Sequence, residues 1–174
     1  MLVSIIIPYY KDKKNIFYSV KSAINQSYRN TEILIIDDEN SNESKKHLSN
    51  IKNTSTKIKV ISTKKNLGVS QARNLGASHA LGNLIAFLDS DDIWKKDKLA
   101  IQVDFMKKNK IDLCYTNYYA LKDKKIIYKV KIQKSLNYNQ LLKECPISCS
   151  SVLLKRDILI KNKFKKLKTK EDYE

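Results

Sequence analysis

The chain has 174 residues, 42% of them hydrophobic and 9% aromatic, which is enough for one domain with a buried core and excludes a disordered chain. Three glycines and two prolines are too few for a turn-rich all-β protein or for flexible linkers. The formal net charge of +16 is compatible with nucleic acid, anionic lipid or a phosphorylated substrate as a partner. Lysine is abundant throughout, so a compositional habit explains the charge equally well.

Targeting signals and structural zinc motifs are absent from the sequence pattern. No stretch approaches the ~20 apolar residues that span a bilayer, and no basic region precedes the short apolar run at residues 2–7. We therefore expect a cytoplasmic location. The three cysteines are then expected to be free thiols, and neither histidine lies near a cysteine at zinc-finger spacing.

The first half of the chain alternates between apolar runs typical of buried strands and segments with helical periodicity. In chain order we expect a strand at 2–7, a helix at 14–26, a strand at 32–36, a helix at 41–51 capped by Ser41, a strand at 57–62, a helix at 69–80, a strand at 83–88 and a helix at 95–108. This order predicts a parallel sheet with helices on both faces.

The second half has a mixed pattern. We expect a strand at 111–119, an edge strand at 125–131, a short helix at 136–143, a strand at 150–154 and a basic tail at 161–170. The fold class is therefore α/β, with a mostly parallel sheet flanked by helices and followed by a mixed C-terminal segment. We expect residues 1–174 to form a single domain.

Unusual residues follow three of the expected parallel strands: Pro8-Tyr9-Tyr10, Asp37-Asp38 and Asp89-Ser90-Asp91-Asp92. Ligands of open α/β sheets bind outside the carboxyl ends of the strands, so these residues are expected to meet at one edge. Clustered carboxylates repel one another unless a cation lies among them, and hard oxygen ligands suit Mg²⁺ or Mn²⁺. Such a metal would keep positions open for diphosphate oxygens.

Each of these groups also has a purely structural interpretation. Asp37-Asp38 could form a turn or cap the next helix, and Tyr9 and Tyr10 could be packing at the rim of the sheet. Asp89–Asp92 could cap the helix expected near residue 95. Because one aspartate is sufficient for a cap, three carboxylates in four residues favour the metal site.

Five motifs, in matching order and spacing, carry a resemblance to a known family: Val3–Tyr10, Ser22–Tyr28, Glu32–Asp38, Asn66–Asn74 and Ile85–Trp94. The chain resembles the N-terminal part of a family 2 glycosyltransferase with the Rossmann-like GT-A fold, strongly over residues 1–106. The resemblance implies an inverting transfer of sugar from a nucleotide-sugar, with a UDP-sugar favoured, to a hydroxyl acceptor. The products would be bacterial-type surface polysaccharide, lipooligosaccharide or another glycan.

The resemblance also implies roles for individual residues. Residues 1–106 would bind the nucleotide-sugar, and 107–174 would form an acceptor-side half that is incomplete here. The nucleotide-binding positions would be Pro8, Tyr10, Asp38, Arg73, Asp89 and Asp91. Pro8 and Tyr10 would line the base, with the Tyr10 ring able to stack on uracil, and Asp38 would accept a hydrogen bond from the base N–H. Asp91 and Asp92 would contact the ribose and the Mg²⁺ or Mn²⁺ ion.

The catalytic base is expected at Asp172, because family members place an aspartate of a Glu-Asp pair well after the acidic motif and Glu171-Asp172 is such a pair. The alternative interpretation is a solvated acidic chain end. Relatives in the family continue beyond this point, so a non-catalytic nucleotide-sugar-binding module or an inactive truncated transferase is the alternative function.

Partners follow from the same resemblance. The acceptor is expected to be a glycan or a lipid-linked glycan, so the protein would approach the inner face of a membrane. The basic tract Lys161–Lys170 is the segment expected to contact anionic lipid. Nucleic acid is not expected as a partner, because neither a zinc finger nor an aromatic RNA-binding signature is present.

Overall fold

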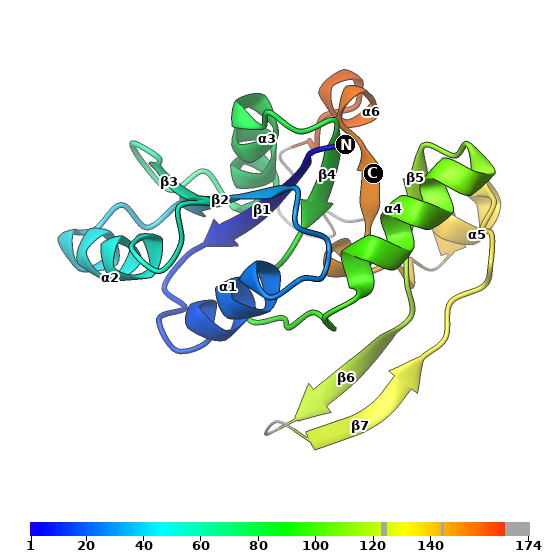
Figure 1. Ribbon diagram of the computed structural model, residues 1–174, viewed down its shortest axis with the longest axis horizontal. Coiled ribbons are helices and arrows are strands. Elements are labelled where there is room, and N and C mark those ends of the chain that lie inside the picture. Colours follow the sequence, from blue (N-terminus) through cyan, green and yellow to red (C-terminus); the bar gives the residue numbers. More distant parts are fainter. Residues whose placement is uncertain (123–124, 144, 166–174) are drawn as a thin grey trace.

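A computed structural model describes residues 1–122, 125–143 and 145–165 of the chain as one six-stranded sheet, its covering helices and a projecting hairpin (Figure 1). The strands are β1 (Val3–Tyr9), β2 (Thr31–Asp37), β3 (Ile58–Ser62), β4 (Leu84–Phe87), β5 (Leu113–Cys114), β6 (Tyr118–Lys122), β7 (Lys125–Val130) and β8 (Leu153–Lys155). The helices are α1 (Ile16–Ile24), α2 (Asn42–Lys52), α3 (Val69–His79), α4 (Lys98–Asn109), α5 (Tyr138–Lys143), the 3₁₀ turn η1 (Cys149–Ser151) and α6 (Arg156–Lys161).

The sheet has the strand order β3-β2-β1-β4-β8-β5, and its first four members are parallel. β1 lies in the centre, where Ile5 pairs with Ile33 of β2 on one side and with Ala86 of β4 on the other. A strand covered on both faces must be apolar throughout, which explains the uninterrupted run of β1. The parallel sheet predicted for the first half is confirmed.

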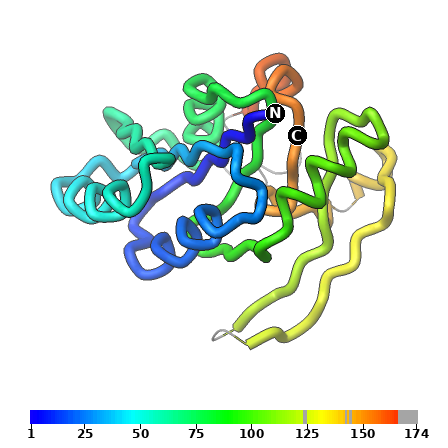
Figure 2. The backbone as a smooth tube through the Cα atoms, in the orientation of Figure 1, coloured from blue at the N-terminus to red at the C-terminus, as the bar shows by residue number. Residues whose placement is uncertain are grey.

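Helices cover both faces of this sheet, as Figure 2 shows, and two apolar cores result. Alternate residues of β1 divide between the cores: Ile5 and Ile7 pack with α1, α2 and α4, whereas Ile6 packs with α3 and α6. The predicted cap of α2 is confirmed, since the Ser41 hydroxyl accepts the N–H of Ser44 at 2.9 Å.

Two predictions for the second half are wrong in detail. The strand expected at 111–119 is divided: β5 pairs with β8 for two residues only, and β6 then leaves the sheet to form a separate hairpin with β7. Much of the strand expected at 150–154 is the turn η1, which Val152 closes by donating its N–H to the carbonyl of Cys149. β8 follows it and runs antiparallel to β4.

The fourth helix begins at Lys98 instead of residue 95. The buried side chain of Gln26 explains the delay, because its amide donates to the carbonyl of Lys95 and accepts the N–H of Leu99. Residues 93–97 are thereby held against the end of α1 as an irregular segment, with a turn at residues 96–97, before the helix starts.

Two further observations concern the whole described chain. Among the described residues the cysteines at 114, 145 and 149 form no disulfide, as expected. No helix in the part of the chain that the structure describes is both long and apolar enough to cross a bilayer.

The close contact between α3 and β1 provides a test of the fold. A Cβ atom added at Gly76 would lie 2.5 Å from Cγ2 of Ile6, a branched group in the middle of the sheet. We expect Gly76→Ala to lower the free energy of unfolding by about 1–3 kcal/mol through overpacking, despite alanine's higher helix propensity. Urea denaturation measures this, with Ser78→Ala on the exposed side of α3 as the control. A neutral or stabilising Gly76→Ala would contradict the packing.

Candidate functional site

A cavity of about 740 Å³ lies at the carboxyl ends of β1, β2 and β4, bounded on one side by the start of α3. Parallel strands place their carboxyl ends at one edge, which is why loops far apart in sequence meet here. The cavity is lined by all six residues that were predicted to bind a nucleotide: Pro8, Tyr10, Asp38, Arg73, Asp89 and Asp91. Their individual roles remain predictions, whereas their convergence is a property of the structure.

The two tyrosines that end β1 point in different directions. Tyr10 is 50% exposed at the cavity rim, whereas Tyr9 is fully buried and stacks near His47, with ring centroids 6.5 Å apart. Burial, with nearby acidic groups, raises the pKa of the Tyr9 phenol to about 12. Tyr9 also lines the cavity, but its ring belongs chiefly to the core. The interpretation of these tyrosines as packing residues therefore applies to Tyr9 and not to the half-exposed Tyr10.

The two aspartates after β2 form different sets of hydrogen bonds. Asp37 is a turn residue: its carboxylate accepts the N–H of Asn40 and the hydroxyl of Ser44, as the turn interpretation proposed. Asp38 accepts the backbone N–H groups of Leu67 and Gly68, each at 2.8 Å. Asp38 therefore fixes the loop between β3 and α3 at the cavity wall, a function that sequence reasoning missed.

Arg73 is joined to the acidic segment by an ion pair. Its guanidinium donates to Oδ1 of Asp89 at 2.9 Å, and its centre lies 5.8 and 5.7 Å from the rings of Phe87 and Phe164. The arginine is only 4% exposed. A buried cation held between two aromatic faces and one carboxylate keeps Asp89 at a fixed position beside the cavity.

Asp91 and Asp92 lie in different surroundings. Asp91 is exposed and lines the cavity, whereas Asp92 is half-buried and lies outside the cavity lining. Burial raises the pKa of the Asp92 carboxyl, the carboxylates of Asp89 and Asp91 raise it further, and a hydrogen bond from Ser150 opposes the rise. Of the two predicted metal ligands, the structure brings only Asp91 to the cavity. Within the described ranges, no group of three acidic, histidine or cysteine side chains is arranged to hold a metal ion.

Two buried serines hold the acidic segment, and neither was identified from the sequence. Ser150 of η1 accepts the N–H of Asp89 at 3.0 Å, and its carbonyl accepts the indole N–H of Trp94 at 2.8 Å. From α1, Ser19 is hydrogen-bonded to the carbonyls of Ser90 and Asp92, at 2.6 and 2.7 Å. No local pattern distinguishes these serines from others, because their importance arises from contacts across about 60 to 70 residues of chain.

The helix-cap interpretation of the acidic segment is not supported. The N-cap position of α4 is Asp97, which forms no side-chain cap hydrogen bond, and the helix begins beyond it.

Asp12 was not predicted, yet it lines the cavity and accepts the hydroxyl of Ser90 at 2.9 Å. Asp172, the predicted base, lies outside the described residues.

A mostly parallel sheet with a nucleotide-sized cavity and an acidic segment at its carboxyl edge defines a protein of the GT-A fold class. The chain belongs to glycosyltransferase family 2, whose family model (glycosyl transferase family 2) matches residues 4–162. It is 38% identical over 158 residues to WfgD of Escherichia coli, described as a UDP-Glc:alpha-D-GlcNAc-diphosphoundecaprenol beta-1,3-glucosyltransferase. That alignment covers 91% of this chain and 62% of WfgD, so the chain spans about three fifths of that relative's length.

Solved structures share the fold at lower sequence identity. S. aureus TarS in complex with UDP-GlcNAc superposes with a TM-score of 0.80 at 21% identity, over 99% of this chain and 51% of TarS. The mannosyltransferase PcManGT of Pyrobaculum calidifontis, solved with GDP-Man and Mn²⁺, superposes with a TM-score of 0.71 at 17% identity, over 94% of this chain and 47% of that one.

The hydroxyl of Ser150 can be tested by its removal. We expect Ser150→Ala to lower the free energy of unfolding by about 1–3 kcal/mol, because it leaves the Asp89 N–H and the Asp92 carboxyl without their buried partner. Ser148→Ala is a matched control, since Ser148 donates no hydrogen bond to the acidic segment in the described structure. Equal unfolding free energies for the two variants, measured in urea, would contradict this role.

Proposed function

We propose that the protein transfers a sugar from a UDP-sugar to a hydroxyl of a lipid-linked glycan, with inversion at the anomeric carbon. The observation that carries the proposal is the convergence of the six predicted nucleotide-binding residues around one cavity. The description of WfgD, which names a UDP-sugar donor and a diphosphoundecaprenol-linked acceptor, supports this choice of substrates.

The donor is oriented by the residues at the end of the sheet. The half-exposed ring of Tyr10 offers a face on which uracil can stack. Pro8 and Asp38 lie at the same cavity, where they would enclose the base. Arg73 is enclosed by aromatic rings and paired with Asp89, so it would act mainly by fixing the wall that the diphosphate contacts.

A divalent ion fits the chemistry of the acidic segment, because Asp91 offers an exposed carboxylate oxygen at the cavity and two further carboxylates lie within three residues of it. Mg²⁺ or Mn²⁺ would be held by Asp91, with diphosphate oxygens among the remaining ligands. When bound, the ion would stabilise negative charge on the departing nucleotide. PcManGT, solved with Mn²⁺, supports a metal in this fold.

The acceptor hydroxyl must lose a proton during transfer, and Asp172 is the residue to which we assign this step. The assignment rests on the family resemblance of Glu171-Asp172. A lipid-linked acceptor would bring the protein to the inner face of a membrane, where Lys161–Lys170 would contact anionic lipid.

Metal-dependent donor binding is the first test. We expect UDP with Mn²⁺ to raise the melting temperature of the wild type, since a ligand at 100 times its Kd stabilises a protein by about 2.7 kcal/mol. Asp91→Asn should abolish the part of this increase that requires Mn²⁺. Asp104→Asn, which changes an exposed aspartate of α4 that does not line the cavity, should retain it. An undiminished, metal-dependent increase in Asp91→Asn would refute the metal assignment.

The catalytic base is the second test. We expect Asp172→Asn to reduce the rate of sugar transfer by about 10²–10⁴-fold, while stabilisation by UDP and Mn²⁺ stays at the wild-type level. Transfer is measured with a UDP-sugar and a diphosphate-linked GlcNAc acceptor, and NMR of the product gives the anomeric configuration. A retained configuration, or wild-type rates in Asp172→Asn, would contradict the proposal.

A further inference from the structure

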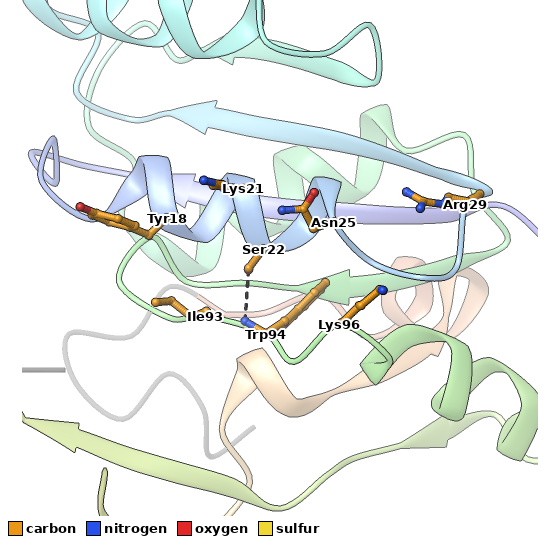
Figure 3. A pocket seen from close by; sticks show the side chains of 8 residues that line it. All are labelled: Tyr18, Lys21, Ser22, Asn25, Arg29, Ile93, Trp94 and Lys96. Atoms are coloured by element: carbon orange, nitrogen blue, oxygen red, sulfur yellow. Dashed lines mark hydrogen bonds between the residues drawn. The ribbon is translucent and has the colours of Figure 1, made fainter. Parts of the chain in front are cut away.

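A second cavity, of about 570 Å³, lies on the outer side of α1, between this helix and residues 93–96 (Figure 3). Its lining includes Lys21 of α1, Asn25 at the end of this helix, Arg29 from the loop that follows, and Trp94 and Lys96 of the irregular segment before α4. None of its lining residues belongs to the first cavity. The acidic segment and its continuation nevertheless contribute to both, since residues 89–91 line the first cavity and residues 93, 94 and 96 line the second.

All charged side chains that line this cavity in the described part of the chain are basic. Lys21, Arg29 and Lys96 line it, and neither aspartate nor glutamate does. Within residues 1–122, 125–143 and 145–165, none of these three cations forms an ion pair. Elsewhere in the protein several lysines do pair with carboxylates, as Lys59 does with Glu32 and Lys155 with Asp112. A concave surface lined by one sign of charge concentrates the field and attracts counter-ions.

The two walls of the cavity are held together by hydrogen bonds. Ser22 of α1 accepts the N–H of Trp94 at 3.1 Å, the contact drawn in Figure 3. The N–H of Ser27 donates to the carbonyl of Lys96 at 2.9 Å. The Gln26 amide, which delays the start of α4, fixes the same segment. The backbone at Lys96 is therefore fixed before any ligand arrives, and the Arg29 carbonyl accepts the N–H of Thr31 at 2.9 Å. This order lowers the entropic cost of binding an anion.

The shape and the remaining lining indicate what kind of anion fits. The volume is larger than a bare phosphate requires, and the exposed side chains of Tyr18 and Ile93 provide an apolar flank next to the cations. The Asn25 amide adds a neutral donor. Arginine and lysine together suit the several oxygens of a phosphate group, because the guanidinium fork can bind two of them at once.

We propose that this second cavity binds a phosphate-bearing group, with the phosphate between Arg29 and Lys96, which lie at the same end of the cavity in Figure 3, and the rest of the ligand extending past Lys21 towards Tyr18 and Ile93. The proposed site shares no lining residue with the donor cavity, and the proposal does not rest on the transferase function. Its ligand is either a soluble phosphate compound or the headgroup of an anionic lipid, and the two sources share the same recognition chemistry.

Trp94 makes the site directly measurable, because it is the single tryptophan of the chain and it lines the cavity. Intrinsic fluorescence of the full chain is titrated with inorganic diphosphate at constant ionic strength and without divalent metal. Cosedimentation with vesicles of phosphatidylcholine, alone or mixed with phosphatidylglycerol, tests the lipid source. Binding of diphosphate indicates a soluble ligand, and binding only to the anionic vesicles indicates a lipid headgroup.

The decisive comparison uses two variants with the same change in charge. We expect the double variant Arg29→Gln and Lys96→Gln to weaken binding of the preferred probe about 10- to 30-fold, given about 1 kcal/mol for each cation lost. Lys45→Gln with Lys46→Gln removes two exposed lysines of α2 and should change binding by roughly twofold or less. Equal losses in both variants would show that the excess of positive charge binds nonspecifically and would overturn the proposal, as would a wild type that binds neither probe.

Stabilisation by UDP and Mn²⁺ is measured on the same variants to separate this site from the donor site. We expect it to be unchanged in both, because neither pair of residues lines the donor cavity. If the wild type is not stabilised by UDP and yet binds the phosphate probe through Arg29 and Lys96, then the proposed transferase function fails while the second site stands.

Discussion

The candidate site depends on how the acidic segment Asp89–Asp92 is held after it leaves β4. A segment beyond the end of a strand has no neighbouring ladder to fix it, and three carboxylates in four residues repel one another. Two buried hydroxyls supply the missing constraint: Ser19 binds two carbonyls of the segment, and Ser150 binds its first N–H. Because they come from α1 and η1, the segment is fixed from both sides only when the whole sheet has assembled.

This constraint places two cavities of opposite electrostatic character along one stretch of chain. The first has carboxylates at its edge, so an anionic diphosphate is repelled there unless a divalent cation accompanies it. The second is lined by cations and attracts anions without such help. The hydrogen bond from the Trp94 N–H to Ser22 and the Gln26 contacts hold the second cavity, just as the two serines hold the first. A loss of either set of contacts would affect both cavities through the shared segment.

The first half of the fold could be predicted because its two central strands, β1 and β2, are seven residues long and buried on both faces. An uninterrupted apolar run such as Ile5-Ile6-Ile7 has few alternatives to a central strand, and regular crossover helices fix the parallel order. The short strands could not be predicted in the same way. β5 pairs over two residues and β8 over three, which is less than the length at which periodicity carries information. Their existence is decided by partners distant in sequence.

The sequence by itself determined the class of site, because strand ends carrying Tyr10, Asp38 and Asp89–Asp92 meet at one edge in any parallel α/β sheet. It also determined the family, through five motifs in register. Only the tertiary structure decided the direction of each side chain: Tyr9 into the core, Asp38 onto a loop, Asp92 towards Ser150 and away from the cavity. Those directions are set by hydrogen bonds and packing between segments that become adjacent only after folding. They therefore cannot be predicted from the local sequence.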